Sequence, residues 1–451
     1  MGAQEGGQRA EPVRRESSLR AWLLHFVYDL LWVICALFSS PWWVTRCLIN
    51  STFRRLVWER LGFELKKVRA KGAAPRVLVH GVSVGEVKAA QSLVVGLEES
   101  GYEVVISATT DTGVDVASKV YGGDRVARFP LDFSPVVRRF LRSLRLDAVV
   151  LVELEVWPSF LLAANHTDIP VVVVNGRITA RSYERYDAFR YLLPQFHRIS
   201  MFCVQDEEYA ARFKDLSSQA RRIVVTGNIK VDALPLELRA PGAEIQQLVC
   251  GEASRQLVVA GSTHEPEERW VVDAWRAHFP DAALVLCPRH PDRCDELSVR
   301  LGGRVQRLTE LRSKGEERDE SRALLIDTVG ELEEIYGLAD VVIVGGTLVQ
   351  HGGQNMMEPA AAGRAVIHGP SFENFVQEAR LLERAGASRV IAGEHELGAT
   401  VRELLADDSL RSEMGELGRA AIAGERGATH ATLVALEEML PKAGSGDVAA
   451  G

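Results

Sequence analysis

The sequence lacks the residue groupings that usually hold a metal, a disulfide framework or a nicotinamide cofactor. Its 451 residues include six cysteines, and no two of them form a CxxC pair. No HExxH sequence, EF-hand loop, Walker phosphate loop or GxGxxG fingerprint is present either. We therefore expect no metal site and no cofactor, and we interpret the scattered cysteines as thiols of a reducing compartment.

The chain has no strong overall charge, and it is not short of apolar residues. Its formal net charge is −8 and 47% of its residues are hydrophobic, so its length can supply the cores of two or three domains. The charge is uneven, because residues 1–75 hold twelve Lys or Arg against six Asp or Glu. This basic end is also apolar, which favours a membrane surface as its partner, and we expect no nucleic-acid partner.

Residues 21–50 are predicted to be a membrane-anchor segment that follows a polar tail of residues 1–20. Ala21 to Phe38 is apolar and about long enough to cross the hydrocarbon of a bilayer. His25 and Asp29 fall on one helical face within it, however, and charged groups are costly at that depth. A helix lying in the interface therefore competes with a transmembrane span, and a packing helix of the first domain is the third alternative.

Beyond Arg76, apolar strand-like runs alternate with helical or loop segments. Continuous β-branched runs indicate strands covered on both faces, hence mostly parallel, doubly wound sheets. We predict a first Rossmann-like domain over residues 51–232, a linker over 233–250, a second Rossmann-like domain over 251–440 and a disordered tail over 441–451. Two such domains are expected to face a cleft, where small-molecule sites prefer to form.

Glu86 follows the apolar run Arg76 to Val79 and the glycines Gly81 and Gly85. This order predicts a buried strand, a tight turn and a helix, with Glu86 at the carboxyl end of the strand where open α/β sheets hold ligands. The other interpretation is a first-turn acid that the helix dipole favours. The stretch alone leaves both interpretations open.

Similar polar clusters follow several predicted strands of the second domain. Paired glycines leave backbone N–H groups free for phosphate oxygens, and Arg289 supplies a positive fork suited to phosphate. Glu358, after Gly352-Gly353, is an acceptor for ribose hydroxyls. Any one of these clusters could be ordinary loop chemistry, but their repetition predicts an anion and nucleotide site.

A series of motifs, in order along the chain, resembles the 3-deoxy-D-manno-octulosonic acid (Kdo) transferases of lipopolysaccharide assembly. They are SVGE, ELEVWP, NGRIT, VTGNIKVD, GSTHEPEE, PRHPDR, GELEEIYGLADVVIVGGTLV and GGQNMMEPAAAGRAVIHGP, and the match runs from about Trp22 to about Leu440. The resemblance implies a GT-B fold and a membrane-associated enzyme that transfers Kdo from CMP-Kdo to a lipid A precursor, with inversion. It places the catalytic domains on the cytoplasmic side of the inner membrane, whose lipids are expected partners.

The resemblance also implies roles for individual residues. Glu86 is expected to be the general base, and Glu153 and Lys230 are expected to support the transition state. The expected CMP-binding residues are Pro288, Arg289, Val329, Gly330, Glu331, Asn355, Met356, Met357 and Glu358. Further donor candidates are Thr263, His264 and Gly346, and the acceptor candidates are Ser83, Thr110 and Arg177.

The sequence departs from the family pattern at a few positions. Gln354 stands where a His is expected, Gly176 and Thr179 alter an NARLS-like element, and Val156 interrupts ELWP. A charged role at position 354 is therefore in doubt. The alternatives are another GT-B enzyme, either a UDP-sugar transferase or an enzyme like UDP-N-acetylglucosamine 2-epimerase, and a membrane-tethered nucleotide- or lipid-binding protein without catalysis.

Overall fold

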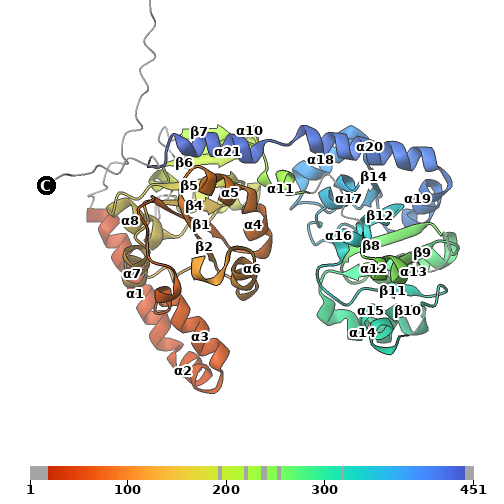
Figure 1. Cartoon of the computed structure of the whole chain (residues 1–451), viewed down its shortest axis with the longest axis horizontal. Helices are drawn as coiled ribbons and strands as arrows, with labels where there is room; N and C mark the ends of the chain where they lie inside the picture. Colours follow the sequence, from red (N-terminus) through yellow and green to blue (C-terminus); the bar gives the residue numbers. More distant parts are fainter. Residues whose placement is uncertain are drawn as a thin grey trace, which may run out of the picture. The chain divides into compact units, whose positions relative to one another are not determined.

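The computed structural model describes residues 19–190, 196–217, 222–234, 241–250, 255–315 and 318–441. The tails predicted over 1–20 and 441–451 lie almost wholly outside the described residues. The chain divides into two compact units, one of Met1–Ala233 with Arg426–Gly451 and the other of Leu234–Glu425. Figure 1 labels their helices and strands.

The first unit is built on a seven-stranded sheet in the order β3-β2-β1-β4-β5-β6-β7, in which every neighbouring pair is parallel. Its strands are β1 (Arg76–Gly81), β2 (Glu103–Ala108), β3 (Val126–Arg128), β4 (Ala148–Val152), β5 (Val171–Gly176), β6 (Met201–Val204) and β7 (Arg222–Val225). Its helices are α1 (Leu19–Phe38), α2 (Ser40–Ile49), α3 (Ser51–Arg60), α4 (Val84–Ala89), α5 (Gln91–Glu99), α6 (Asp111–Tyr121), α7 (Ser134–Leu144), α8 (Pro158–His166), α9 (Ala180–Phe189), α10 (Glu207–Ser217), α11 (Ile229–Asp232) and α21 (Ala428–Glu437).

The second unit repeats this plan with the strand order β10-β11-β9-β8-β12-β13-β14, again all parallel. Its strands are β8 (Leu257–Thr263), β9 (Ala283–Pro288), β10 (Val305–Arg307), β11 (Ala323–Leu325), β12 (Val341–Val344), β13 (Ala365–His368) and β14 (Ser388–Val390). Its helices are α12 (Ala243–Cys250), α13 (Glu267–His278), α14 (Cys294–Leu301), α15 (Leu308–Lys314), α16 (Leu332–Tyr336), α17 (Met357–Ala361), α18 (Val376–Ala385), α19 (Glu394–Ala406) and α20 (Asp408–Gly424).

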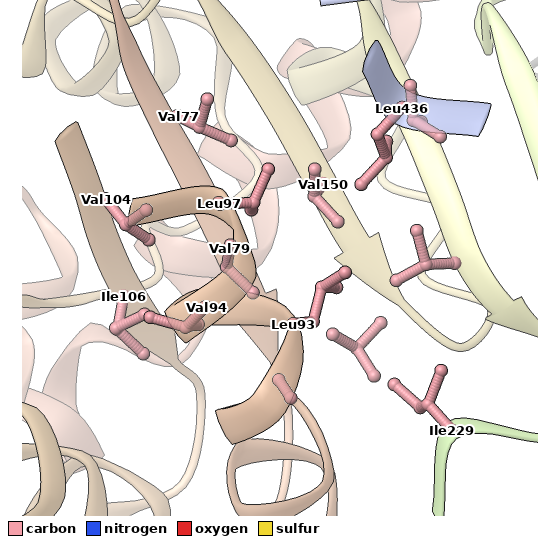
Figure 2. Packing of buried hydrophobic residues seen from close by; sticks show 14 of the residues in the cluster. Val77, Val79, Leu93, Val94, Leu97, Val104, Ile106, Val150, Ile229 and Leu436 are labelled. Atoms are coloured by element: carbon pink, nitrogen blue, oxygen red, sulfur yellow. The ribbon is translucent and has the colours of Figure 1, made fainter. Parts of the chain in front are cut away.

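The central strands are buried along their whole length because helices cover both faces of each sheet. In β1, Val77 and Val79 face one hydrophobic cluster while Leu78 faces another. The first cluster includes Leu93 of α5 and Leu436 of α21, which lie over the same face in Figure 2. This two-sided burial is the reason that the strands read as continuous apolar runs, and it confirms the predicted pair of doubly wound sheets.

The boundaries of the units differ from those predicted, and the structure corrects two of them. Helix α21 belongs to the first unit, whereas residues 251–440 were predicted to form the second domain. Its apolar face completes the cluster around β1, and the Asp232 carboxylate accepts from the Gly427 N–H at 2.9 Å. Residues 243–250 of the predicted linker form α12, which belongs to the second unit and buries Ile245 and Val249.

Candidate active site

Glu86 lies in the first turn of α4, directly after the carboxyl end of the central strand β1. Gly81 permits this sharp entry, because a Cβ at that position would lie 3.0 Å from the Glu86 Cβ. Glycine is therefore needed at position 81 because the first turn of α4 comes so close to the end of β1 that it leaves no room for a side chain. Gly85 is different, since a Cβ there would meet only the Ser83 Oγ at 3.9 Å.

The Glu86 carboxylate is held by both of its oxygens. The Val82 N–H donates to Oε2 at 2.6 Å, and the Ser83 hydroxyl donates to Oε1 at 2.8 Å. Ser83 is also the N-cap of α4, since its Oγ accepts from the Glu86 N–H at 3.5 Å. Both interpretations of Glu86 are thus geometrically possible, because this residue hydrogen-bonds to the N-cap serine of α4 in the first turn of the helix and also lies at the strand end.

Glu153 forms an ion-paired group with two cations from other elements. It follows β4, and its oxygens accept from the Arg177 Nε at 3.0 Å and from the Lys230 Nζ. Glu153 has a φ of +62°, a strained left-handed backbone that non-glycine residues rarely adopt and that clusters at functional sites. The structure therefore brings together two of the expected catalytic residues, Glu153 and Lys230.

Lys230 is positioned by a network around α11. The Asn228 side chain caps this short helix by accepting from the Lys230 N–H at 3.0 Å, and the Asn175 Oδ1 accepts from the Ile229 N–H at 3.1 Å. Asn175 is buried and also has a positive φ of 55°. The backbone at Lys230 is thus held by contacts that sequence analysis did not identify, and its amine is held by Glu153.

The electrostatics separate the carboxylates of this edge. Burial first, and then the charge of Glu153, raises the pKa of Glu86. Burial would also raise the pKa of Glu153, but Lys230 and Arg177 outweigh it and lower that pKa. The site therefore contains one carboxylate kept ionised by cations beside another that binds a proton more readily.

Glu155 is a third carboxylate of this group that sequence analysis did not single out. The Trp157 indole N–H donates to its Oε2 at 2.8 Å. Burial, followed by the charges of Glu86 and Glu153, raises its pKa to about 7. The signal in the sequence was the alternation Glu153-Leu154-Glu155, whose meaning depends on burial that the sequence does not show.

The three acceptor candidates are all engaged within the first unit. Ser83 donates to Glu86, and Arg177 donates to Glu153. The Thr110 hydroxyl donates to the Val82 carbonyl at 3.1 Å and accepts from the Gly113 N–H at 3.0 Å, as the N-cap of α6. Ser83 and Thr110 therefore build the turn around Glu86, and a direct contact with the acceptor stays a prediction for all three.

Gly176 can be explained by packing. A Cβ at this position would lie 3.1 Å from the Val204 Cγ1 and 3.3 Å from the Cys203 carbonyl oxygen. The neighbouring strand β6 is therefore too close for a larger residue without adjustment. The departure at Thr179 has a different basis, since its hydroxyl caps α9 by accepting from the Ser182 N–H at 3.2 Å.

In the second unit, the predicted donor residues lie at the carboxyl ends of the adjacent strands β11, β9, β8 and β12. Pro288 ends β9 and is buried, and Arg289 follows it with an exposed side chain. The Arg289 N–H donates to the Thr263 carbonyl at 3.0 Å, which joins the ends of β9 and β8. Within the described part of the chain, the Arg289 guanidinium forms no hydrogen bond or ion pair.

The Val329 to Glu331 turn follows β11. Val329 is 87% exposed and Gly330 has a φ of +101°, which favours glycine. Glu331 accepts from the Arg312 guanidinium at 2.5 Å and from the Thr328 hydroxyl at 2.8 Å. The turn is therefore fixed at its Glu331 end, while its apolar end is open to solvent.

The Asn355 to Glu358 run forms the start of α17. The Asn355 amide donates to Glu358 at 3.0 Å, and its oxygen accepts from the Met357 N–H at 3.0 Å. The side chains of Met356 and Met357 are buried in the core. A ligand could therefore meet the two methionines only through their backbone, whereas Asn355 and Glu358 keep polar side chains at the strand end.

The backbone N–H groups of His264 and Gly346 both donate to the Glu267 carboxylate, a contact that was not predicted. Glu267 is 1% exposed and accepts from the N–H groups of His264 at 2.8 Å, Gly346 at 2.7 Å and Leu348 at 3.0 Å. These contacts join the turn after β8 to the turn after β12. Thr263 is turned inward, since its hydroxyl donates to Glu268 at 3.2 Å.

Gln354 contacts the imidazole of His264. Its amide donates to the His264 Nε2 at 3.1 Å, and the His264 ring stacks on His351 with 4.2 Å between centroids. Burial, followed by the charges of His351 and His290, lowers the pKa of His264 to about 4. The imidazole is therefore neutral near pH 7, which suits a neutral amide at position 354.

Among the described residues, no group of three or more His, Cys, Asp or Glu side chains is arranged to hold a metal ion. In the first unit, the Glu86 carboxylate has a raised pKa and lies near the Glu153–Lys230 ion pair. The second unit has glycine-containing turns at its strand ends and, among the residues that the structure describes, an Arg289 guanidinium without a hydrogen bond or ion pair. Such turns and cations are suited to a phosphate-containing ligand.

Two Rossmann-like units, each with a parallel sheet and polar residues at its strand ends, define the GT-B fold. Solved structures support this fold at 12–14% identity, with a TM-score of 0.56 in each case. One is the Staphylococcus aureus MnaA–UDP co-structure, which covers 81% of this chain and 96% of that chain. The other is UDP-N-acetylglucosamine 2-epimerase from Neisseria meningitidis bound to UDP-GlcNAc, which covers 81% of this chain and 99% of that chain.

The chain belongs to the 3-deoxy-D-manno-octulosonic acid transferases. Residues 55–233 match a family described as 3-deoxy-D-manno-octulosonic-acid transferase (kdotransferase). The transferase of that name from Bordetella pertussis is 35% identical over 84% of this chain and 91% of its own length. The one from Haemophilus influenzae is 30% identical over 92% of this chain and 99% of its own length.

Proposed function

We propose that this glycosyltransferase moves Kdo from CMP-Kdo to a hydroxyl group of a lipid A precursor, with inversion at the anomeric carbon. The observation that carries the proposal is the Glu86 carboxylate, which is held at the end of β1 with a raised pKa beside the Glu153–Lys230 ion pair. Membership of the Kdo transferase family supports the choice of sugar. We infer in addition that the donor nucleotide is CMP and that the acceptor is a lipid A precursor.

Glu86 acts as the general base in this proposal. Its carboxylate accepts the proton of the acceptor hydroxyl while that oxygen bonds to the anomeric carbon. The bond from this carbon to the phosphate oxygen breaks, and CMP leaves with the electron pair. A raised pKa brings the carboxylate closer to the operating pH, where a general base is most effective.

Glu153 and Lys230 support the charge that develops during transfer. Glu153 stays ionised because Lys230 and Arg177 lower its pKa. The Lys230 side chain is 38% exposed, so its ammonium group can also reach an anionic group of the substrate. A positive charge fixed in advance stabilises a negatively charged transition state without reorganisation.

The second unit binds CMP in this proposal. The exposed Arg289 guanidinium meets the phosphate, and the N–H groups of the glycine-rich turns add donors. Asn355 and Glu358 offer an amide and a carboxylate to the ribose and base. The neutral His264 and Gln354 can hydrogen-bond to the donor without adding charge.

The enzyme works at the cytoplasmic face of the inner membrane, in contact with its lipids. Activated CMP-sugars are made in the cytosol, and a lipid A precursor is held in a membrane. The exposed apolar residues of α1 and α2 support this location. The intact protein should sediment with membranes and be partly released when residues 1–50 are deleted, whereas full solubility of the intact chain would contradict the location.

The decisive experiment combines purified protein, a lipid A precursor and a system that generates CMP-Kdo. The lipid product is then weighed by mass spectrometry. We expect a mass increase of one or more Kdo units with CMP-Kdo and none with UDP-sugars. An unchanged lipid in the presence of CMP-Kdo, or transfer from a UDP-sugar, would overturn the proposal.

A further inference from the structure

The N-terminal helices carry a group of contacts that fixes how the chain approaches a membrane. Helix α1 directs its polar residues toward the body of the first unit. The Tyr28 hydroxyl donates to the Asp132 carboxylate at 3.0 Å, and the Asp29 carboxylate accepts from the Ser134 N–H at 3.1 Å. His25 is buried and contacts the Arg198 guanidinium at 2.8 Å.

The same part of the first unit also holds the end of α3. Arg128 donates to Glu59 at 2.7 Å, and the Leu131 N–H donates to the Arg60 carbonyl at 3.0 Å. The segment from Arg128 to Ser134 therefore binds both the first half of α1 and the last turn of α3. The chain therefore runs away from this part of the first unit along α1 and returns to it along α3.

Between these two attachments, the helices form a projection that we call the prong, comprising residues 33–53. Figure 1 shows α2 projecting from the body of the first unit, and α2 has no buried residue. Three apolar side chains of the prong are largely exposed, since Phe38 is 84%, Ile49 80% and Leu48 75% exposed.

The prong has a defined corner. The Trp43 indole donates to the Ala36 carbonyl at 2.9 Å, which fixes α2 against α1. The Trp42 ring packs edge-on against Phe53 of α3 with 5.6 Å between centroids. The Arg46 guanidinium lies over both rings, 5.3 Å from the centroid of Trp42 and 5.1 Å from that of Phe53.

Among the described residues, no single helix is long and apolar enough to cross a bilayer. Leu23–Phe38 and Ser40–Ile49 meet that requirement only as a pair, and they are bent by 61° at the break between them. If α1 crossed the membrane, His25, Tyr28 and Asp29 would lie within its hydrocarbon, and their partners Asp132 and Arg198 would have to follow or separate. Both outcomes are costly for charged groups.

We propose that the prong enters a single leaflet of an anionic lipid bilayer and returns on the same side, so that the segments before α1 and after α3 face the same compartment. The proposal rests on the membrane location proposed above and adds the mode of insertion. Six residues of α1 beyond Trp32 reach about 9 Å, which is less than the roughly 15 Å of hydrocarbon in one leaflet. The prong is therefore too short to cross.

The charges of the prong and its base fit this depth. Arg46, Arg54 and Arg55 are exposed, and arginine beside tryptophan suits the headgroup level of an anionic surface. Arg46 on α2 keeps that helix near the headgroups while Leu48 and Ile49 enter the acyl region. This arrangement is that of an interfacial helix, whose binding depends on both apolar area and lipid charge.

Labelling of cysteines tests the predicted topology in the full-length protein. Cys35, Cys47 and Cys250 are replaced by serine, and one cysteine is introduced by Ser17→Cys or, as a control at an exposed position of α20, by Ser409→Cys. Spheroplasts are then treated with a maleimide that cannot cross membranes. We expect both cysteines to react only after lysis. Reaction of Cys at position 17 in intact spheroplasts, without reaction at 409, would show a spanning helix and overturn the inference.

Vesicle binding tests the tip of the prong. The double change Leu48→Glu with Ile49→Glu should weaken partitioning into phosphatidylcholine vesicles containing phosphatidylglycerol by at least about tenfold. Val299→Glu is the matched control, because Val299 is 81% exposed in the second unit and should have no effect. Equal binding of the double variant would overturn the inference, whereas failure of the unaltered protein to bind membranes would overturn the proposed location itself.

Discussion

Glu86 and Glu267 occupy comparable places in the two units. Each lies in the first turn of the helix that follows the first strand of its sheet, after β1 and β8 respectively. Their surroundings are very different. Glu267 accepts three backbone N–H groups and is buried, whereas Glu86 accepts one backbone N–H and one hydroxyl and is only partly buried.

The difference shows how one sequence pattern can serve two purposes. In the second unit all the contacts of the acid join the turns after β8 and β12, so it stabilises the loops that we propose bind the donor. In the first unit the acid keeps oxygen lone pairs for a substrate and lies near a second carboxylate, Glu153. Glu86 is therefore a candidate base, and Glu267 is a structural residue.

The largest expected effect is on turnover when Glu86 is changed. A positioned general base contributes about 10²–10⁴-fold, so Glu86→Ala should lower kcat by that factor and leave CMP affinity nearly unchanged. Steady-state kinetics and calorimetry with CMP measure the two quantities. A parallel loss of CMP affinity and kcat would remove the base role and make Glu86 resemble Glu267.

The next effect is on stability when Glu267 is changed. Glu267→Ala leaves three N–H groups without their acceptor, so the free energy of unfolding should fall by about 3 kcal/mol or more. Urea unfolding of Glu267→Ala and Glu86→Ala provides the comparison, since the second variant should lose only about 1 kcal/mol. An equal decrease in the free energy of unfolding for both variants would mean that Glu86 and Glu267 stabilise the fold to the same extent.

The sequence contains the information for Glu86 but not for its counterpart. An apolar run, a close-approach glycine and a capping serine are all within ten residues of Glu86, so local patterns predicted its strand end. The partners of Glu267 include Gly346 and Leu348, 79 and 81 residues away in the chain. No local pattern reports such contacts, and they were found only in the structure.

Long-range packing explains the other gaps in the same way. Lys230 reaches Glu153 across 77 residues, and the family motifs, not the spacing, suggested this pair. Helix α21 reads as a final helix of the second unit, yet Leu436 completes the core of the first. The periodicity of a helix predicts an apolar face but not the unit against which that face packs.

A smaller effect concerns the pH dependence of stability in the first unit. The pKa of Glu155 is raised from 4.5 to about 7, so the folded state disfavours its ionisation. The associated stability is fully present below pH 4.5 and is lost as the pH rises through about 7. Glu155→Gln should therefore gain about 1–3 kcal/mol relative to the unaltered protein at pH 8 but not at pH 4.5.

Glu153→Gln is the matched control for Glu155, because the pKa of Glu153 is shifted downward by Lys230 and Arg177 in spite of burial. Its ionised form stabilises the folded state at neutral pH, and that stability is lost as the pH falls through the lowered pKa. Urea unfolding at pH 4.5 and pH 8 measures the change in the free energy of unfolding for each variant. At pH 8 this change should be positive for Glu155→Gln and negative for Glu153→Gln. The same sign for both would show that burial alone controls this group of carboxylates.

The smallest expected effect is on CMP binding when Gln354 is changed. It tests whether the site of the second unit is neutral, in contrast to the charged site of the first. Gln354→Ala removes one hydrogen bond to His264, which should weaken CMP binding about two- to tenfold. The loss should be the same at pH 6 and pH 8, because the pKa of His264 is lowered to about 4 and the ring stays neutral. Gln354→Glu places a carboxylate beside the imidazole, raises its pKa and should make CMP binding depend on pH over this range. Calorimetry with CMP at both pH values decides the matter, and pH dependence in Gln354→Ala, or none in Gln354→Glu, would contradict a neutral His264 at the donor site.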